Sequence, residues 1–207
     1  MKALNNILTG AALMMSVACS GTTKAETSPL NNENTQKTQT GKALVVFFSH
    51  AGENYSVGVI DKGNTKWVAE FIQELTGADM FEVEAEKSYD MPYNQLIKVA
   101  QDEQRNGEKP AYKGQVPDLS QYDTIYIGTP IWWGTYPQVM FTFFDKNDLN
   151  GKTLMPFATH EGSGLGNTIN DLKKAYPNAT IKSGLAIRGS QAKNSKSQVE
   201  RWINNNK

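Results

Sequence analysis

The chain has 207 residues, with 21 Lys and Arg, 21 Asp and Glu, and 39% hydrophobic residues. This length accommodates one ordinary domain with a real core, and the composition is that of a globular protein. The balance of charge gives no electrostatic case for binding nucleic acid, so no such partner is expected.

The first eighteen residues predict an export signal. Lys2 precedes an apolar run at 7–18 that is too short to span a bilayer. The run ends at Cys19, the only cysteine, and small residues before a cysteine resemble a lipoprotein signal, although Ser16 stands where leucine is usual. The alternative is a secreted protein with a free thiol, which is a liability in an oxidising compartment. We therefore interpret 1–18 as a lipoprotein signal peptide and Cys19 as the lipidated residue.

Residues 19–41 are polar, low in complexity and without aromatic side chains. Such a segment cannot bury enough apolar surface to fold, and it predicts a flexible tether. The folded domain is expected at 42–207. A tether behind a lipidated cysteine lets a domain stand off a bacterial membrane, so the expected location is outside the cytoplasm, facing the periplasm or the exterior.

Apolar runs and helical spacing predict ten elements within this domain. In chain order they are a strand at 43–49, a helix at 64–77, a strand at 78–86, a helix at 93–107, a strand at 122–130, a helix at 137–147, a strand at 152–160, a helix at 166–177, a strand at 179–189 and a helix at 195–206. In the first helix, Asn64 or Thr65 is the expected N-cap and Gly77 the stop.

Alternation of strand and helix predicts an α/β fold, a doubly wound five-stranded parallel sheet with helices on both faces. In such sheets ligands bind outside the carboxyl ends of the strands. The segments 49–65, 129–137 and 159–168 follow the first, third and fourth strands. Hydroxyls and backbone N–H groups at a helix start suit a phosphate. The aromatic segment 129–137 suits the face of a flat ring, and the glycine-rich segment 159–168 suits its polar edge. A phosphate and a flat ring with a polar edge are the parts of FMN.

The order of elements, the three loops and the stretches "WWGTYP" and "THEGSGLG" resemble the flavodoxin superfamily over residues 42–205, in its subgroup with a lengthened first loop. The resemblance implies the strand order 2-1-3-4-5. It also implies a phosphate held by Ser49, Asn64 and Thr65, an isoalloxazine flanked by residues 130–134 with one tryptophan as its wall, and a far side wrapped by residues 159–166. The expected FMN-binding residues are Ser49, His50, Asn54, Asn64, Thr65, Pro130, Ile131, Trp132, Trp133, Gly134, Thr159, His160, Glu161, Gly162, Ser163, Gly164 and Gly166.

Two features depart from typical flavodoxins. Residues 50–63 form a long insertion in which Asn54 and Tyr55 are expected to fold over the phosphate or ribose. Typical flavodoxins are also strongly acidic, which steers basic redox partners, whereas this chain is near neutral. Its redox partner, a protein or a small-molecule electron acceptor, is therefore expected to differ in kind.

Other chemistries find little support in these loops. "GSGLG" lacks the last glycine of the dinucleotide fingerprint, and Ser163 does not lie in a G-x-S-x-G motif. His50 and His160 are two potential metal ligands without a third. No metal site and no catalytic residue are assigned.

The favoured function is FMN-dependent electron transfer. One alternative is a flavin-dependent NAD(P)H oxidoreductase that acts on a quinone or nitro compound. The other is a flavin-free binding module on the same scaffold, because a chain exported unfolded has to acquire its flavin outside the cytoplasm.

Overall fold

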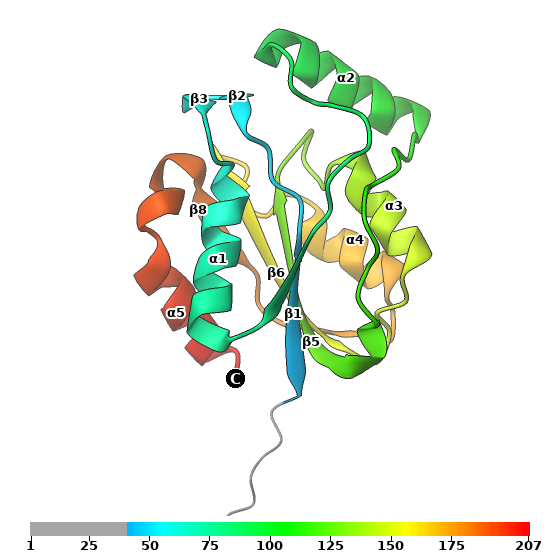
Figure 1. Cartoon of the computed structure of the whole chain (residues 1–207), viewed down its shortest axis with the longest axis vertical. Coiled ribbons are helices and arrows are strands. Elements are labelled where there is room, and N and C mark those ends of the chain that lie inside the picture. The colour runs from blue at the N-terminus through cyan, green and yellow to red at the C-terminus, as the bar shows by residue number, and fades with distance from the viewer. Residues whose placement is uncertain (1–40) are drawn as a thin grey trace, which may run out of the picture. The chain divides into compact units, whose positions relative to one another are not determined.

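The computed structural model describes residues 41–207, so the predicted signal peptide, Cys19 and, except for Gly41, the predicted tether lie outside the described residues. In chain order the elements are β1 (Lys42–Phe47), β2 (Gly52–Asn54), β3 (Gly58–Ile60), α1 (Asn64–Thr76), β4 (Asp79–Glu82), α2 (Tyr93–Asn106), the 3-10 helix η1 (Leu119–Gln121), β5 (Tyr122–Pro130), α3 (Gln138–Lys146), β6 (Thr153–His160), α4 (Thr168–Ala175), β7 (Thr180–Ile181), β8 (Leu185–Arg188), the 3-10 helix η2 (Gly189–Asn194) and α5 (Lys196–Asn205) (Figure 1). None of these helices has the length and apolar character needed to cross a membrane.

The main sheet is parallel and has the order β4-β1-β5-β6-β7, with β8 also pairing with β6. Counting β7 and β8 as one interrupted strand, this is the predicted 2-1-3-4-5 order, and the predicted doubly wound fold is confirmed. The strand order reverses between β1 and β5, which places the switch point at the carboxyl ends of these two strands.

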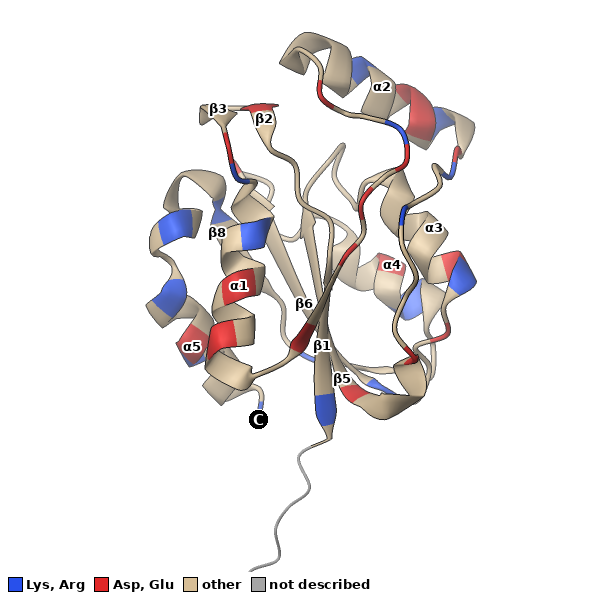
Figure 2. Cartoon of the chain, viewed as in Figure 1, with Lys and Arg blue, Asp and Glu red and all other residues tan. Residues whose placement is uncertain are grey.

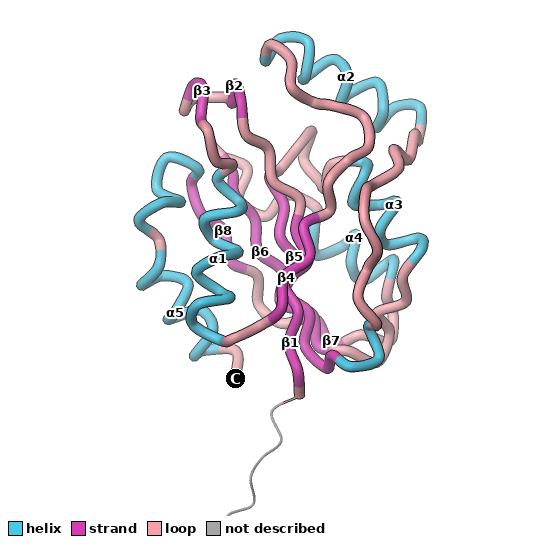
Figure 3. The backbone as a smooth tube through the Cα atoms, in the orientation of Figure 1, coloured by secondary structure: helices cyan, strands magenta, loops and turns pink. Residues whose placement is uncertain are grey.

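Both faces of the sheet are covered by helices, which explains the unbroken apolar runs. In β1, Val45 and Phe47 pack in one core cluster with α1 and α5, while Leu44 and Val46 pack in another with α3 and α4. The backbone trace shows the two helix pairs on opposite sides of the sheet (Figure 3).

Helix α2 covers neither face of the sheet. It lies across the top of the molecule, beyond the carboxyl ends of the strands, and packs on α3 (Figure 1). The predicted placement of helices on both faces therefore holds for α1, α3, α4 and α5, whereas α2 stands over the edge at which ligands are expected.

The last predicted strand is interrupted after Ile181. The backbone N–H of Ser183 donates to Asn206 Oδ1 (3.1 Å), and its carbonyl accepts from Trp202 Nε1 (2.7 Å). The backbone N–H and carbonyl of Ser183 thus bond to side chains at the end of α5 instead of to β6. This side-chain competition is invisible in the local pattern, which predicts one continuous strand at 179–189.

The insertion at 50–63 contains an antiparallel hairpin, β2 with β3, that no predicted element covers. Its base is closed by Gly63. A Cβ atom at this position would lie 2.2 Å from Ser49 Oγ and 2.7 Å from the His50 carbonyl oxygen. Because glycine has no side chain, the end of the insertion can pack against Ser49 and His50, where the insertion begins, and continue directly into α1.

Candidate functional site

A cleft of about 310 Å³ opens at the carboxyl edge of the sheet, where the three predicted loops meet. The predicted site residues that line it are His50, Asn54, Asn64, Thr65, Pro130, Ile131, Trp132, Thr159, His160, Glu161, Gly162 and Ser163. Those that do not line it are Ser49, Trp133, Gly134, Gly164 and Gly166. The lining also contains Tyr55 from the hairpin, together with Tyr93, Leu96 and Gly189, which the prediction omitted.

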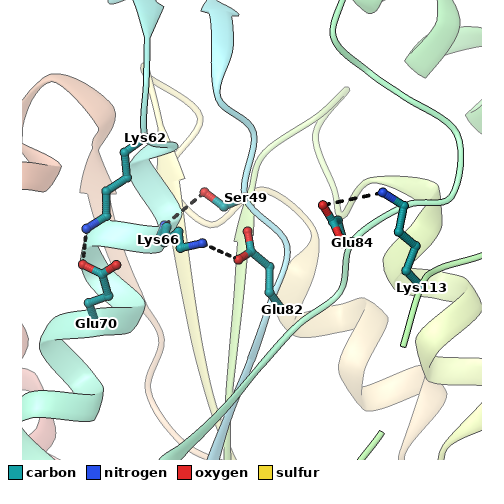
Figure 4. A network of polar contacts seen from close by, with 7 residues as sticks. All are labelled: Ser49, Lys62, Lys66, Glu70, Glu82, Glu84 and Lys113. Carbon is teal, nitrogen blue, oxygen red and sulfur yellow. Dashed lines mark hydrogen bonds and ion pairs between the residues drawn. The ribbon is translucent and has the colours of Figure 1, made fainter. Parts of the chain in front are cut away.

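The first helix starts differently from the prediction. The N-cap of α1 is Gly63, and neither Asn64 nor Thr65 caps it by its side chain. Ser49 Oγ instead accepts the backbone N–H of Lys66 at 3.0 Å, as Figure 4 shows. The cap is thus supplied by Ser49, fifteen positions before the first residue of the helix, a pairing that local spacing cannot reveal.

The side chains beside this helix start are held in place by partners across the fold. Thr65 Oγ1 and Thr159 Oγ1 are buried and 2.8 Å apart, which ties α1 to the end of β6. The Lys66 ammonium is bonded to Glu82 at 2.7 Å. The first N–H groups of a helix have no partner within the helix. That of Lys66 is bonded to Ser49, so the N–H groups of Asn64 and Thr65, together with the two side chains, give this end of the cleft its donors.

Gly189 lies between two polar side chains at the same end. A Cβ atom there would be 2.4 Å from Asn64 Nδ2 and 2.7 Å from Glu161 Oε1. The Glu161 carboxylate also accepts the N–H of Ser190 at 3.1 Å. Gly189 is the last residue of the fifth predicted strand, outside the three loops, so the sequence contained no local signal for its place in the cleft.

The two adjacent tryptophans leave the backbone in a tight turn rather than an extended segment. Trp132 and Thr135 exchange backbone hydrogen bonds of 3.0 and 3.1 Å, and both residues between them, Trp133 and Gly134, have positive φ (46° and 84°). A bulky residue rarely adopts this left-handed conformation. The turn explains how the two side chains separate.

Trp132 forms the inner aromatic wall of the cleft. Its ring packs edge-on against Tyr89 (5.0 Å between centroids), Phe48 (5.3 Å) and His50 (5.9 Å). Trp133, by contrast, is 49% exposed and donates its Nε1–H to the carbonyl of Ile97 in α2 at 2.8 Å. One tryptophan is therefore part of the cleft wall and the other lies at its rim.

The glycine-rich loop packs directly on this turn. A Cβ atom on Gly166 would lie 2.3 Å from the Gly134 carbonyl oxygen, which accepts the N–H of Asn167 at 2.8 Å. Gly134 and Gly166 thus join the second and third loops behind the cleft. They support its walls without lining it.

His50 contributes a buried nitrogen to the cleft region. The side chain is 8% exposed, and its Nε2 has no hydrogen-bond partner among the described residues. Burial lowers the pKa of His50, against the opposing effects of the Glu53 backbone and the Asp90 charge. The imidazole is therefore neutral at pH 7, and its Nε2 is buried without a hydrogen-bond partner among the described residues.

The hairpin and α2 meet over the mouth of the cleft. The N–H of Tyr93, at the start of α2, donates to Glu53 Oε2 at 2.7 Å, and the Tyr55 and Tyr93 rings lie 6.0 Å apart. The β2–β3 hairpin and the start of α2, which are far apart in the sequence, thus form the outer rim of the cleft together.

The parallel sheet, its strand order and a cleft at its switch point define a flavodoxin-like α/β protein. The chain belongs to the flavodoxin family, whose sequence model matches residues 42–206.

Solved structures agree with this assignment. A candidate flavoprotein from Bacteroides uniformis ATCC 8492 is 30% identical, with a TM-score of 0.65, over 79% of this chain and 98% of that chain. A second one, from Bacteroides eggerthii DSM 20697, is 29% identical with a TM-score of 0.64, over 79% and 96%. A flavoprotein from Lactobacillus acidophilus NCFM in complex with FMN is 24% identical and shares the fold, with a TM-score of 0.56 over 79% and 99%. No curated protein matches the sequence.

Proposed function

We propose that this chain binds FMN in the cleft and transfers electrons through it, while tethered outside the cytoplasm by lipid on Cys19. The observation that carries the cofactor assignment is the cleft itself. It places a donor-rich helix start, an aromatic wall and the glycine-rich loop around one space at the switch point. Family membership and the FMN complex of the Lactobacillus flavoprotein support the same cofactor.

The residues present fit the parts of FMN. Asn64, Thr65 and the first turn of α1 suit the phosphate, because hydroxyls, amides and a helix N-terminus all favour an anion. Trp132 and Ile131 supply a flat apolar wall for the ring. The His50 imidazole packs edge-on behind Trp132 and supports that wall.

Bound FMN supplies the redox chemistry, and the chain binds it, orients it and sets its access to water and to partners. Helix α2 and the β2–β3 hairpin screen the mouth of the cleft, while the Glu161 carboxylate places negative charge at its edge. That charge disfavours an anionic reduced ring and lowers the reduction potential.

A comparison of FMN with riboflavin tests the phosphate end. FMN is expected to bind on the order of tenfold tighter or more, since hydrogen bonds to a charged group contribute about 1.5–3 kcal/mol each. Thr65→Val should reduce this preference. Thr142→Val is the matched control, because its buried hydroxyl bonds within α3 to Gln138. Flavin fluorescence quenching measures the affinity of each of the three proteins for both flavins, and equal binding of riboflavin and FMN by the wild type would exclude the assignment.

Two further measurements separate the alternatives. A visible flavin spectrum from natively purified protein argues against a flavin-free binding module. Steady consumption of NADPH by the pure, FMN-loaded protein would instead indicate an oxidoreductase, because a carrier depends on a separate reductase.

A further inference from the structure

A groove of about 500 Å³ lies between the β2–β3 hairpin and the segment 84–90, which leads from β4 towards α2. The groove and the cleft have only one lining residue in common, His50. The groove is therefore a separate space, and its volume is in the range of small-molecule sites.

The two walls of the groove are attached to different parts of the fold. The hairpin is bonded to the start of α2, at the rim of the cleft. The segment 84–90 pairs instead with residues 111–113, and the Glu86 N–H donates to the Ala111 carbonyl at 2.9 Å. Because each wall has its own attachment, a space is left between them.

The groove contains more negative than positive charge. Its two lysines are already paired. Lys87 is bonded to Glu103 at 2.5 Å, which lies outside the groove, and Lys113 pairs with Glu84 at 3.7 Å (Figure 4). Within the described residues, three further carboxylates of the lining form no ion pair, namely Asp61, Glu86 and Asp90. This excess favours a cationic ligand.

A buried nitrogen faces the same groove. A Cβ atom on Gly52 would lie 3.8 Å from both His50 Nε2 and Asp90 Oδ1. Gly52 and Asp90 line the groove but not the cleft, so this edge of the imidazole is turned towards the groove. The side chain is more than nine-tenths buried, and Nε2 has no partner among the described residues. An unpaired buried polar atom is costly, so a ligand N–H beside Gly52 relieves that cost.

The distribution of the carboxylates determines the kind of cation. In the part of the chain that the structure describes, no three His, Cys, Asp or Glu side chains come together closely enough to hold a metal ion. The carboxylates lie instead on both walls, with Asp61 at the base of the hairpin and Glu86 and Asp90 on the other wall. The lining between them includes the buried rings of Phe48 and Tyr89. Such a surface suits an alkyl chain with a charged group at each end.

We propose that this groove binds an aliphatic diamine, whose ammonium groups pair with carboxylates on the two walls and donate to His50 Nε2. An ammonium has three N–H donors and no acceptor, so one group can bond a carboxylate and the imidazole nitrogen together. The site goes beyond the proposed flavin function and does not depend on it, because its walls are the same with or without FMN.

The test is a titration of the full-length protein, with and without FMN, with 1,5-diaminopentane. The backbone N–H signals of Gly52 in the groove and Gly162 in the cleft are followed in ¹⁵N-labelled protein. We expect a saturable shift of the Gly52 signal in both forms and no shift of the Gly162 signal. 1-Aminopentane has the same chain and one ammonium, and it should bind about fivefold more weakly, while 1,5-pentanediol should not bind.

Charge-neutral variants identify the carboxylates. Asp90→Asn and Asp61→Asn should each weaken binding of the diamine by about fivefold and leave FMN affinity unchanged, because neither residue lines the cleft. Asp102→Asn is the matched control, since Asp102 is an exposed carboxylate outside the groove, and it should bind the diamine like the wild type. His50→Phe keeps a ring but removes the nitrogen, and it should also weaken binding.

Four results would overturn the proposal. They are the absence of a saturable Gly52 shift, equal binding of 1-aminopentane, wild-type affinity in His50→Phe, and equal losses in Asp90→Asn and Asp102→Asn. The last would mean that the amine responds only to overall charge. A Gly162 shift that FMN abolishes would place the amine in the cleft and would also overturn it. Diamine binding by a protein that fails to bind FMN would contradict the proposed function and leave this site intact.

Discussion

Trp132 and Trp133 have separate roles at the scale of single residues. Trp132 contacts Phe48 and Tyr89 in the core and also lines the cleft, whereas Trp133 anchors α2 from an exposed position. The left-handed backbone of Trp133 costs on the order of 1–3 kcal/mol. The contacts that hold α2 offset this strain.

Trp132→Ala should weaken FMN binding by about 1–3 kcal/mol, by analogy with base–aromatic stacking, and should also shift the reduction potential. It should lower the melting temperature as well, since its core contacts are lost. Trp133→Ala is the matched comparison, and its FMN affinity should remain closer to that of the wild type. Affinity by fluorescence and melting temperature are measured for each. If neither variant weakens FMN binding, Trp132 is not the wall of the site.

His50 predicts how stability depends on pH. In the unfolded chain its pKa is about 6.5, whereas burial lowers the pKa in the folded protein. As the pH falls below about 6.5, His50 binds a proton in the unfolded state more readily than in the folded state. The free energy of unfolding therefore decreases.

His50→Gln should make this decrease shallower between roughly pH 7 and pH 5, as measured by urea denaturation at each pH. His160→Gln is the control. The pKa of His160 is also lowered, by burial and by Arg188, but its side chain is partly exposed, so a smaller change is expected. An unchanged slope in His50→Gln would show that another group controls the acid response.

At the scale of elements, α2 depends on a buried carboxylate, Glu103, which is paired with a half-exposed lysine. Glu103 is 1% exposed and is bonded to the Tyr89 hydroxyl and to Lys87. Tyr89 in turn packs against Trp132. This chain of contacts connects α2 to the aromatic wall of the cleft.

Glu103→Gln should destabilise the attachment of α2 by about 1–3 kcal/mol, because a buried charge-assisted pair is lost while half-exposed Lys87 can turn to water. Asp102→Asn, next to it on the same helix, removes only an exposed pair with Arg105 and should have little effect. Hydrogen exchange of residues 93–106 measures the change. Equal protection in both variants would argue that the apolar contacts alone hold α2.

At the scale of the whole molecule, charge offers no strong steering field. Both positive and negative side chains occur on α1, around α5 and around α3 in the view of Figure 2. The near-neutral total agrees with this mixture. We therefore expect partner choice to depend on exposed apolar side chains, namely Tyr55, Val59 and Trp133, more than on long-range attraction.

The proposed tether predicts how the protein is localised. Cys19→Ser should release it from the membrane, because one residue carries the lipid in a lipoprotein. Detergent-phase partitioning of cells that express each form provides the measurement. The wild type should enter the detergent phase and the variant the aqueous phase. A variant that stays with detergent would refute the lipid anchor on Cys19.

The sequence alone determined the strand–helix alternation, the sheet order through family resemblance, and the three loops of the cleft. These follow from local periodicity and from the rule that parallel strands end at one edge. Tertiary structure alone decided the position of α2, the closed hairpin, the Ser49 cap of α1, the place of Gly189 and the break in the last strand. Each depends on groups far apart in the chain, such as Tyr93 with Glu53 or Ser183 with Asn206, whose hydrogen bonds compete with the local pattern only once the fold has brought them together.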